Sequence, residues 1–142
     1  MNNNKVQIKI LSTQHDISEE TMETIYTGNY RKLADKHVIA YDEYFEEEGC
    51  APSKNTNLIK ITTDSVEITK KGTVTTRMLF KSGETYKDIY QTPFGGFDML
   101  LETEQLEISE TDNHISVTIC YSLSLNHAQV SRCTIQMQIK EM

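Results

Sequence analysis

The sequence predicts an all-β protein, built as a single antiparallel up-and-down β-barrel of eight to ten strands. Residues 115–125 alternate apolar and polar side chains without interruption, as expected for a strand with one buried face. Similar strand-like segments recur along the chain, separated by short turn-forming sequences rich in Gly, Asn, Asp and Ser. No long helix is expected to cover an open sheet, so a closed barrel is favoured because it removes the unpaired edges.

We expect ten strands, and their short connections make sequence neighbours antiparallel partners. They cover residues 4–13, 21–33, 37–46, 57–63, 66–71, 74–81, 85–91, 97–108, 114–125 and 130–140. The last two form a long hairpin, because the apolar parity of residues 115–125 returns after Asn126 and His127. The segment 17–26 is ambiguous, since Ile17, Glu20, Met22 and Ile25 also fit a short helix.

Residues 47–55, which contain Gly49, Cys50 and Pro52, form the one long irregular connection in the middle of the chain. Neither flanking part has enough apolar residues for a core of its own. The total of 142 residues is the usual size of one domain. We therefore expect residues 1–142 to form a single β-barrel domain with a loop at residues 47–55.

Composition and charge argue against several classes of binding partner and several cellular locations. The chain has 14 basic and 21 acidic residues, a formal charge of −7, which disfavours binding to duplex nucleic acid. No segment resembles a signal peptide or a membrane span of about 20 apolar residues. Cys120 and Cys133 fall on opposite strand parities, so we expect reduced thiols there. A cytoplasmic protein is expected.

The chain lacks the familiar motifs of catalysis. Its histidines, at positions 15, 37, 114 and 127, and its cysteines have no metal-ligand spacing. No serine-hydrolase elbow and no phosphate-binding glycine loop is present. We therefore expect no enzyme activity, no metal and no cofactor.

The segment from Tyr90 to Phe97 is the strongest local anomaly. Pro93 cannot donate to a strand ladder, and Gly95-Gly96 permits backbone angles closed to other residues. One interpretation places Tyr90, Thr92 and Phe94 at a barrel mouth, where they receive a small ligand. The other makes the segment a sharp corner between strands, with the aromatic rings plugging the barrel end.

Two further side chains are candidates for the barrel interior. Tyr121 interrupts the aliphatic parity of residues 115–125 with a hydroxyl that needs a partner if it is buried. Glu43 belongs to an acidic run that lacks the ligand spacing of a calcium loop, and most of that run reads as solvated charge. Glu43, however, shares the parity of Ile39 and Tyr41, so it is expected to point inward and to need a hydrogen-bonding partner.

Basic residues gather in the middle of the chain. Residues 54–87 carry seven Lys or Arg against three Asp or Glu, and Lys70, Lys71 and Arg77 are candidates for an anion or partner site on an outer sheet face. Few aromatic rings accompany these cations, which makes RNA a weaker partner than protein.

Several short motifs together resemble a known family. They are Tyr41-Asp42-Glu43, Met78-Leu79-Phe80, the segment Tyr90-Gln91-Thr92-Pro93-Phe94-Gly95, and Ile119-Cys120-Tyr121-Ser122-Leu123. In these the chain is similar to the YwiB-like family of small bacterial proteins of unknown function. The resemblance implies a calycin or lipocalin-like barrel and carries no catalytic residues.

The leading hypothesis for function is a non-catalytic protein that encloses a small, partly apolar molecule in its barrel. Its candidate ligand residues are Tyr90, Thr92, Phe94, Tyr121 and Glu43. Barrels of about eight strands either fill with side chains or hold one small molecule, so the interior is the deciding feature. The alternative is an interaction module that binds protein, or less favourably RNA, on its outer face.

Overall fold

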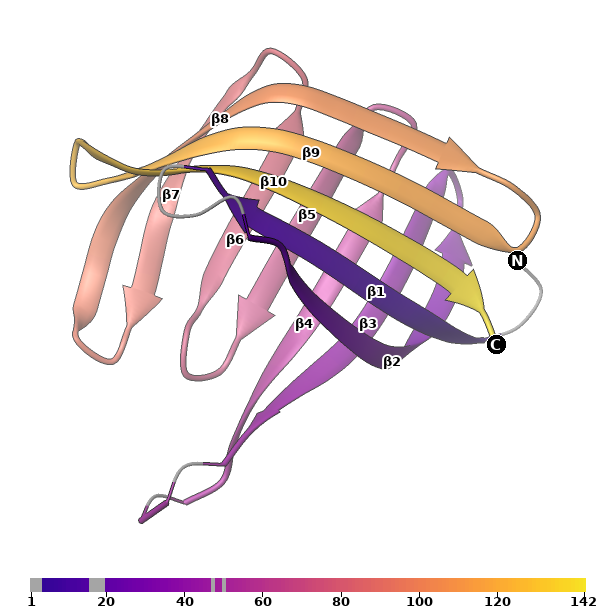
Figure 1. The fold of residues 1–142 in the computed structure, drawn as a ribbon, viewed down its shortest axis with the longest axis horizontal. Coiled ribbons are helices and arrows are strands. Elements are labelled where there is room, and N and C mark those ends of the chain that lie inside the picture. Colours follow the sequence, from indigo (N-terminus) through magenta and orange to yellow (C-terminus); the bar gives the residue numbers. More distant parts are fainter. Residues whose placement is uncertain (1–3, 16–19, 47, 50) are drawn as a thin grey trace.

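A computed structural model of the chain describes residues 4–15, 20–46, 48, 49 and 51–142. These residues form ten strands and no helix, so the predicted all-β class is confirmed (Figure 1). The strands are β1 (Lys5–Gln14), β2 (Met22–Leu33), β3 (Lys36–Phe45), β4 (Ser53–Ile61), β5 (Ser65–Lys71), β6 (Thr76–Lys81), β7 (Thr85–Thr92), β8 (Gly95–Glu110), β9 (His114–Leu125) and β10 (Ala128–Glu141). No helix of the described segments is long and apolar enough to cross a membrane.

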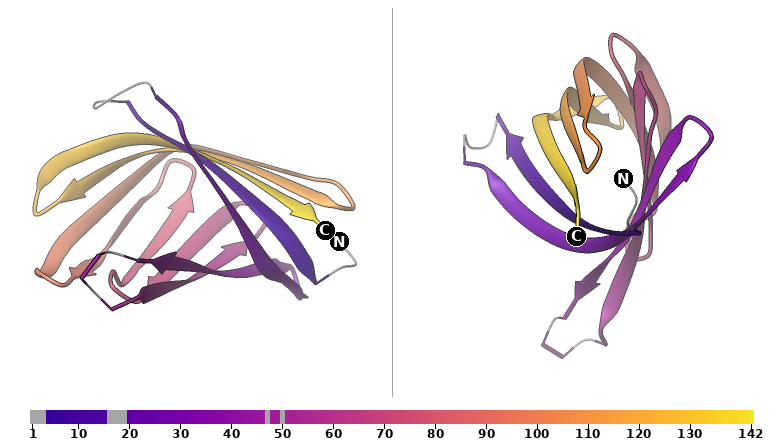
Figure 2. Two further views of the ribbon diagram at one scale, coloured as in Figure 1. Left: turned by 60° about the horizontal axis from the view of Figure 1, so that its bottom comes forward. Right: turned by 90° about the vertical axis from the view of Figure 1, so that its right-hand side faces the viewer.

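The strands form one antiparallel sheet that curves around a common centre (Figure 2). Its order is β6-β5-β4-β3-β2-β1-β10-β9-β8-β7, so every pair of sequence neighbours except β6 and β7 forms a ladder, and β1 also pairs with β10. The two ends of this order meet at β6 and β7, which are joined by one bridge between Thr75 and Gln91 with backbone bonds of 2.9 and 3.0 Å. The result is a nearly closed barrel, consistent with the lipocalin-like form that was expected.

The final hairpin has the predicted orientation. Ile115, Val117 and Ile119 are at most 1% exposed, and their partners across β9 and β10 are Ile139, Met137 and Ile135. Inward side chains from the other strands meet them in one core, whose most buried members include Val6, Ile8, Ile39, Ile59, Ile61, Val66, Phe80 and Leu101. The alternation in the sequence therefore identified the buried face correctly.

The two cysteines of this hairpin lie on opposite faces, as their parity predicts. Cys133 pairs across the strands with Tyr121 on the inner face, and Cys120 pairs with Thr134 on the outer face. Both are free thiols. Cys50 lies outside the described residues.

The expected loop at residues 47–55 is too long. β4 begins at Ser53, and Asn55 already pairs with Glu43 of β3. The sequence misled here because the inward residues of early β4, Asn55 and Asn57, are polar although buried, so no apolar alternation marks the strand. The helical alternative for residues 17–26 is also wrong over residues 22–26, which belong to strand β2 (Met22–Leu33). Ile17 and Glu47 lie outside the described residues.

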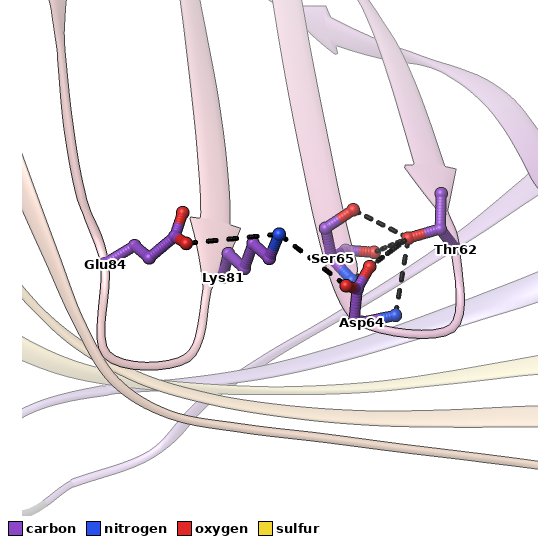
Figure 3. Close-up of polar contacts among 5 residues, drawn as sticks. All are labelled: Thr62, Asp64, Ser65, Lys81 and Glu84. Atoms are coloured by element: carbon purple, nitrogen blue, oxygen red, sulfur yellow. Dashed lines mark hydrogen bonds and ion pairs between the residues drawn. The ribbon is translucent and has the colours of Figure 1, made fainter.

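Charged and polar side chains link two turns at one end of the barrel (Figure 3). The Nζ atom of Lys81, at the end of β6, lies 3.6 Å from Oδ2 of Asp64 in the β4–β5 turn. It also lies 4.0 Å from Oε1 of Glu84 in the β6–β7 turn. Within the β4–β5 turn, the Thr62 hydroxyl accepts a hydrogen bond from the backbone N–H of Ser65. These contacts hold the turns on either side of β6 in place near the weakly paired β6–β7 seam.

Candidate functional site

The barrel contains a half-open cavity of about 560 Å³, which answers the question that the sequence left open. Every strand except β8 contributes a lining side chain. The volume lies in the usual range of small-molecule sites, about 300–1,000 Å³. Most of the wall is apolar, formed by Ile10, Ile59, Ile68, Met78, Phe80, Ile135 and Met137.

One part of the wall is polar and centres on Glu43. The Glu43 Oε1 atom accepts a hydrogen bond of 2.7 Å from Asn57 Nδ2 and forms an ion pair of 3.0 Å with Lys70 Nζ. The Tyr26 hydroxyl donates to Glu43 Oε2 at 3.2 Å. All four of these residues line the cavity, and we call them the polar cluster: Tyr26, Glu43, Asn57 and Lys70.

Strand parity and register bring this polar cluster together. Asn57 shares the inward parity of Ile59 on β4, and Lys70 shares that of Ile68 on β5. Asn57 is directly opposite Tyr41 on β3 and Lys70 on β5, so three adjacent strands present a row of polar groups to the interior. Inward polar side chains must find partners inside the barrel, and here they find one another.

The electrostatics of the polar cluster favour an ionised carboxylate. Burial raises the pKa of Glu43, but hydrogen bonds from Asn57, Lys70 and Tyr26 and the Lys70 charge together hold that pKa below its ordinary value. Burial and the Glu43 charge raise the pKa of Tyr26, so its phenol stays protonated and can donate. The Tyr26 and Tyr41 rings lie with their centroids 4.6 Å apart and their planes tilted by 31°.

A second group of aromatic residues lines the cavity away from the polar cluster. Tyr121 is 8% exposed and meets the edge of Phe80 with ring centroids 4.9 Å apart. Burial raises the pKa of Tyr121, and the neighbouring Cys133 adds to the increase. The Cys133 thiol lies 3.0 Å from the Ser131 hydroxyl. The Tyr121 hydroxyl and the Cys133 thiol group therefore belong to residues that line the cavity.

The candidate ligand residues from the sequence divide into two groups. Tyr90, Tyr121 and Glu43 line the cavity. Thr92 and Phe94 lie instead in the tight β7–β8 turn, where the Thr92 hydroxyl accepts from the Phe94 N–H at 3.1 Å and donates to the Gly95 carbonyl at 3.0 Å. Phe94 is 94% exposed, so it neither lines the cavity nor plugs the barrel end.

The three basic candidates do not share a surface. Lys70 points into the barrel and pairs with Glu43, whereas Lys71 is exposed on the opposite parity. Arg77 lies on the outer side and makes contacts of 3.1 and 3.2 Å with the carboxylate of Glu67. The summed charge of residues 54–87 does not distinguish basic side chains that point into the barrel from those that point outward. The parity of Lys70 with Val66 and Ile68 is the signal that would have placed it inside.

The fold and the cavity define the class: a small antiparallel β-barrel with a half-open, mostly apolar cavity and one polar cluster. The family model of DUF1934, a domain of unknown function, matches residues 6–137, and the chain belongs to this family. Among solved structures it is similar to the crystal structure of the ywiB protein from Bacillus subtilis, with a TM-score of 0.75 and 17% identity over 97% of this chain and 90% of that chain. No curated protein is matched.

These comparisons confirm the resemblance to a YwiB-like family and the barrel fold. At 17% identity the similarity in structure is evidence about the fold alone. What the protein does must therefore be argued from the cavity.

Proposed function

We propose that this protein is a non-catalytic binding protein that takes up a small, partly apolar molecule inside its barrel. The observation that carries the proposal is the cavity of about 560 Å³, with a largely aliphatic and aromatic wall and one polar cluster. Apolar walls with a few convergent polar groups are typical of small-molecule sites, where the apolar area supplies affinity and the polar groups fix orientation.

The state of the polar cluster supports binding over catalysis. A general acid or base works best with a pKa near the working pH, whereas the pKa of Glu43 is held below that of an ordinary glutamate. Its carboxylate is also occupied by donors from Asn57, Lys70 and Tyr26. Such a group is suited to orienting a ligand rather than to moving a proton.

Native mass spectrometry of freshly purified protein, followed by a ligand screen read by melting temperature, tests the proposal. A cavity-filling variant, Ile135→Phe, should abolish any adduct and any ligand-induced rise in melting temperature, because Ile135 lines the cavity. The matched control is Ile108→Phe, which enlarges a partly buried core residue that does not line it. If Ile135→Phe folds and binds as well as wild type, the barrel interior is not the binding site.

A further inference from the structure

We propose that the ligand carries an ammonium group, and that this group is seated against Glu43 and Asn57 while an apolar body occupies the rest of the cavity. This inference rests on the proposed binding function and assigns its ligand class. Three observations carry it: unused hydrogen-bond acceptors, the Glu43 carboxylate that opposes an anion, and a tilted pair of aromatic rings that also lines the cavity.

The polar cluster has more acceptor capacity than its own donors use. A carboxylate offers about four lone-pair sites, and Glu43 receives three donors. The bond to Glu43 Oε2, 3.2 Å from the Tyr26 hydroxyl, is long for an O–H donor. Next to it, Asn57 Oδ1 is buried and has no hydrogen-bond partner within the described part of the chain. A ligand that donates hydrogen bonds would complement these acceptors.

The orientation of the Asn57 amide follows from Glu43. Because the carboxylate can only accept, the amide must turn Nδ2 toward Glu43 Oε1, which leaves Oδ1 as the unpaired acceptor. A buried amide oxygen without a partner has a desolvation cost, and a donor from the ligand would remove it. Asn57 is 0% exposed, lines the cavity and contacts Glu43, so its unpaired acceptor belongs to the same part of the wall as the carboxylate.

The Glu43 carboxylate opposes an anionic ligand. The Lys, Arg, Asp and Glu side chains among the described lining residues are Glu43 and Lys70, which pair with each other, and the solvent-exposed Glu20. A ligand carboxylate would pair with Lys70 only by coming close to Glu43, and that repulsion opposes it. The formal charge of −7 on the whole chain also raises the local concentration of cations.

The tilted ring pair of Tyr26 and Tyr41 supplies the third observation. They line the cavity beside Glu43, and aromatic faces attract ammonium groups when they are partly desolvated. Lys70 already gives Glu43 one ammonium partner at 3.0 Å, and its side chain is 30% exposed. A ligand ammonium would therefore share the carboxylate with Lys70 or displace it toward solvent.

Three probes with one chain length test the assignment: octylammonium, octanol and octanoate. Each is titrated at neutral pH into protein with labelled methyl groups, and the methyl signals of Ile59, Ile68 and Met78 report occupation of the cavity. We expect octylammonium to bind about tenfold or more tightly than octanol, because a charge-assisted hydrogen bond is worth at least that factor. Octanoate should bind most weakly.

Two variants locate the effect. Glu43→Gln should reduce the octylammonium affinity about tenfold and the octanol affinity by a much smaller factor, because an amide oxygen still accepts from a hydroxyl but does not pair with a charge. Glu102→Gln changes the net charge equally at an exposed position of β8 outside the cavity and should leave both affinities unchanged. If Glu43→Gln fails to fold, the wild-type order of the three probes decides the matter.

The outcomes separate this inference from the proposed function. If octanoate binds best, or if all three probes bind equally, the ammonium assignment is overturned while a binding cavity stands. If no probe moves the cavity methyl signals, the proposed function fails and the assignment fails with it. An equal loss of octylammonium affinity in Glu43→Gln and Glu102→Gln would mean that net charge alone attracts the probe, which also overturns the assignment.

Discussion

Two walls of the same barrel differ in what their inward positions carry. The apolar wall, formed by β9 and β10, presents Ile115, Val117, Ile119, Met137 and Ile139 to the interior. The polar wall, formed by β3, β4 and β5, presents Glu43, Asn57 and Lys70. Both obey the same alternation of side chains. Alternation therefore sets the direction in which a side chain points, whereas the polarity of the inward side chains distinguishes a candidate binding site from a packed core.

The apolar wall itself has two parts, seen in one cross-strand pair. Ile119 is 0% exposed and does not line the cavity, whereas its partner Ile135 is only partly buried and does. The empty volume thus borders β10 at this level of the barrel.

Truncation in the packed part of the apolar wall should be the most damaging change. We expect Ile119→Ala to lower the free energy of unfolding by about 3 kcal/mol, because it removes a fully buried side chain and leaves a void. Ile135→Ala should cost about 1 kcal/mol, since its side chain already borders empty space. Urea denaturation of both variants measures the difference, and equal losses would contradict a cavity beside Ile135.

Removal of the central carboxylate should disrupt the polar wall. Glu43→Leu leaves Lys70 and Asn57 without their acceptor, and we expect a loss of about 2 kcal/mol. The double variant Glu43→Leu/Lys70→Met removes both charges and should recover part of that loss. A double-mutant cycle by urea denaturation gives the coupling. Strictly additive single losses would show that the two residues act independently.

Acid should weaken the polar wall specifically. The folded-state pKa of Glu43 is lowered from the ordinary value of 4.5, so its contribution is present above pH 4.5 and is lost as the pH falls through the lower folded value. We expect the free energy of unfolding of wild type to fall more steeply over this acidic range than that of Glu43→Gln.

A control variant at Asp88 is needed in the comparison of stability at acidic pH. Its pKa is also lowered, chiefly by the hydrogen bond from the Tyr86 hydroxyl, at the exposed β7 strand. Asp88→Asn should therefore remove a smaller part of the acid dependence than Glu43→Gln. A wild-type profile that matches the Glu43→Gln profile at every pH would be evidence against an ionised carboxylate in the cavity.

The smallest effect is expected on the outer parity of β5. Lys71→Glu changes an exposed residue, and the free energy of unfolding should stay within about 0.5 kcal/mol of wild type. Lys70→Glu, one position earlier, should destabilise the protein clearly, because it places a second carboxylate beside Glu43. Melting curves of the two variants compare the faces of one strand, and similar curves would contradict the inward position of Lys70.

The features that could be predicted from the sequence are those that follow from the local alternation of apolar and polar residues. All ten strands were expected near their observed positions, and the inward direction of Glu43 followed from its parity with Ile39 and Tyr41. The partners of Glu43 did not follow, because Asn57 lay in an expected strand read only for its fold and Lys70 was assigned to an outer face. Thr92 and Phe94 were placed at a ligand site because a tight turn and a barrel mouth both attract glycine and proline.

The sequence by itself determined which segments are strands and which side chains share a face, because period-two alternation is a property of neighbouring residues. Only the tertiary structure decided that Asn57 and Lys70 meet Glu43, that β1 pairs with β10, and that the interior keeps a cavity of about 560 Å³. Those features depend on register between strands and on how side chains from distant segments fill a shared volume, and neither is encoded in any single stretch of the chain.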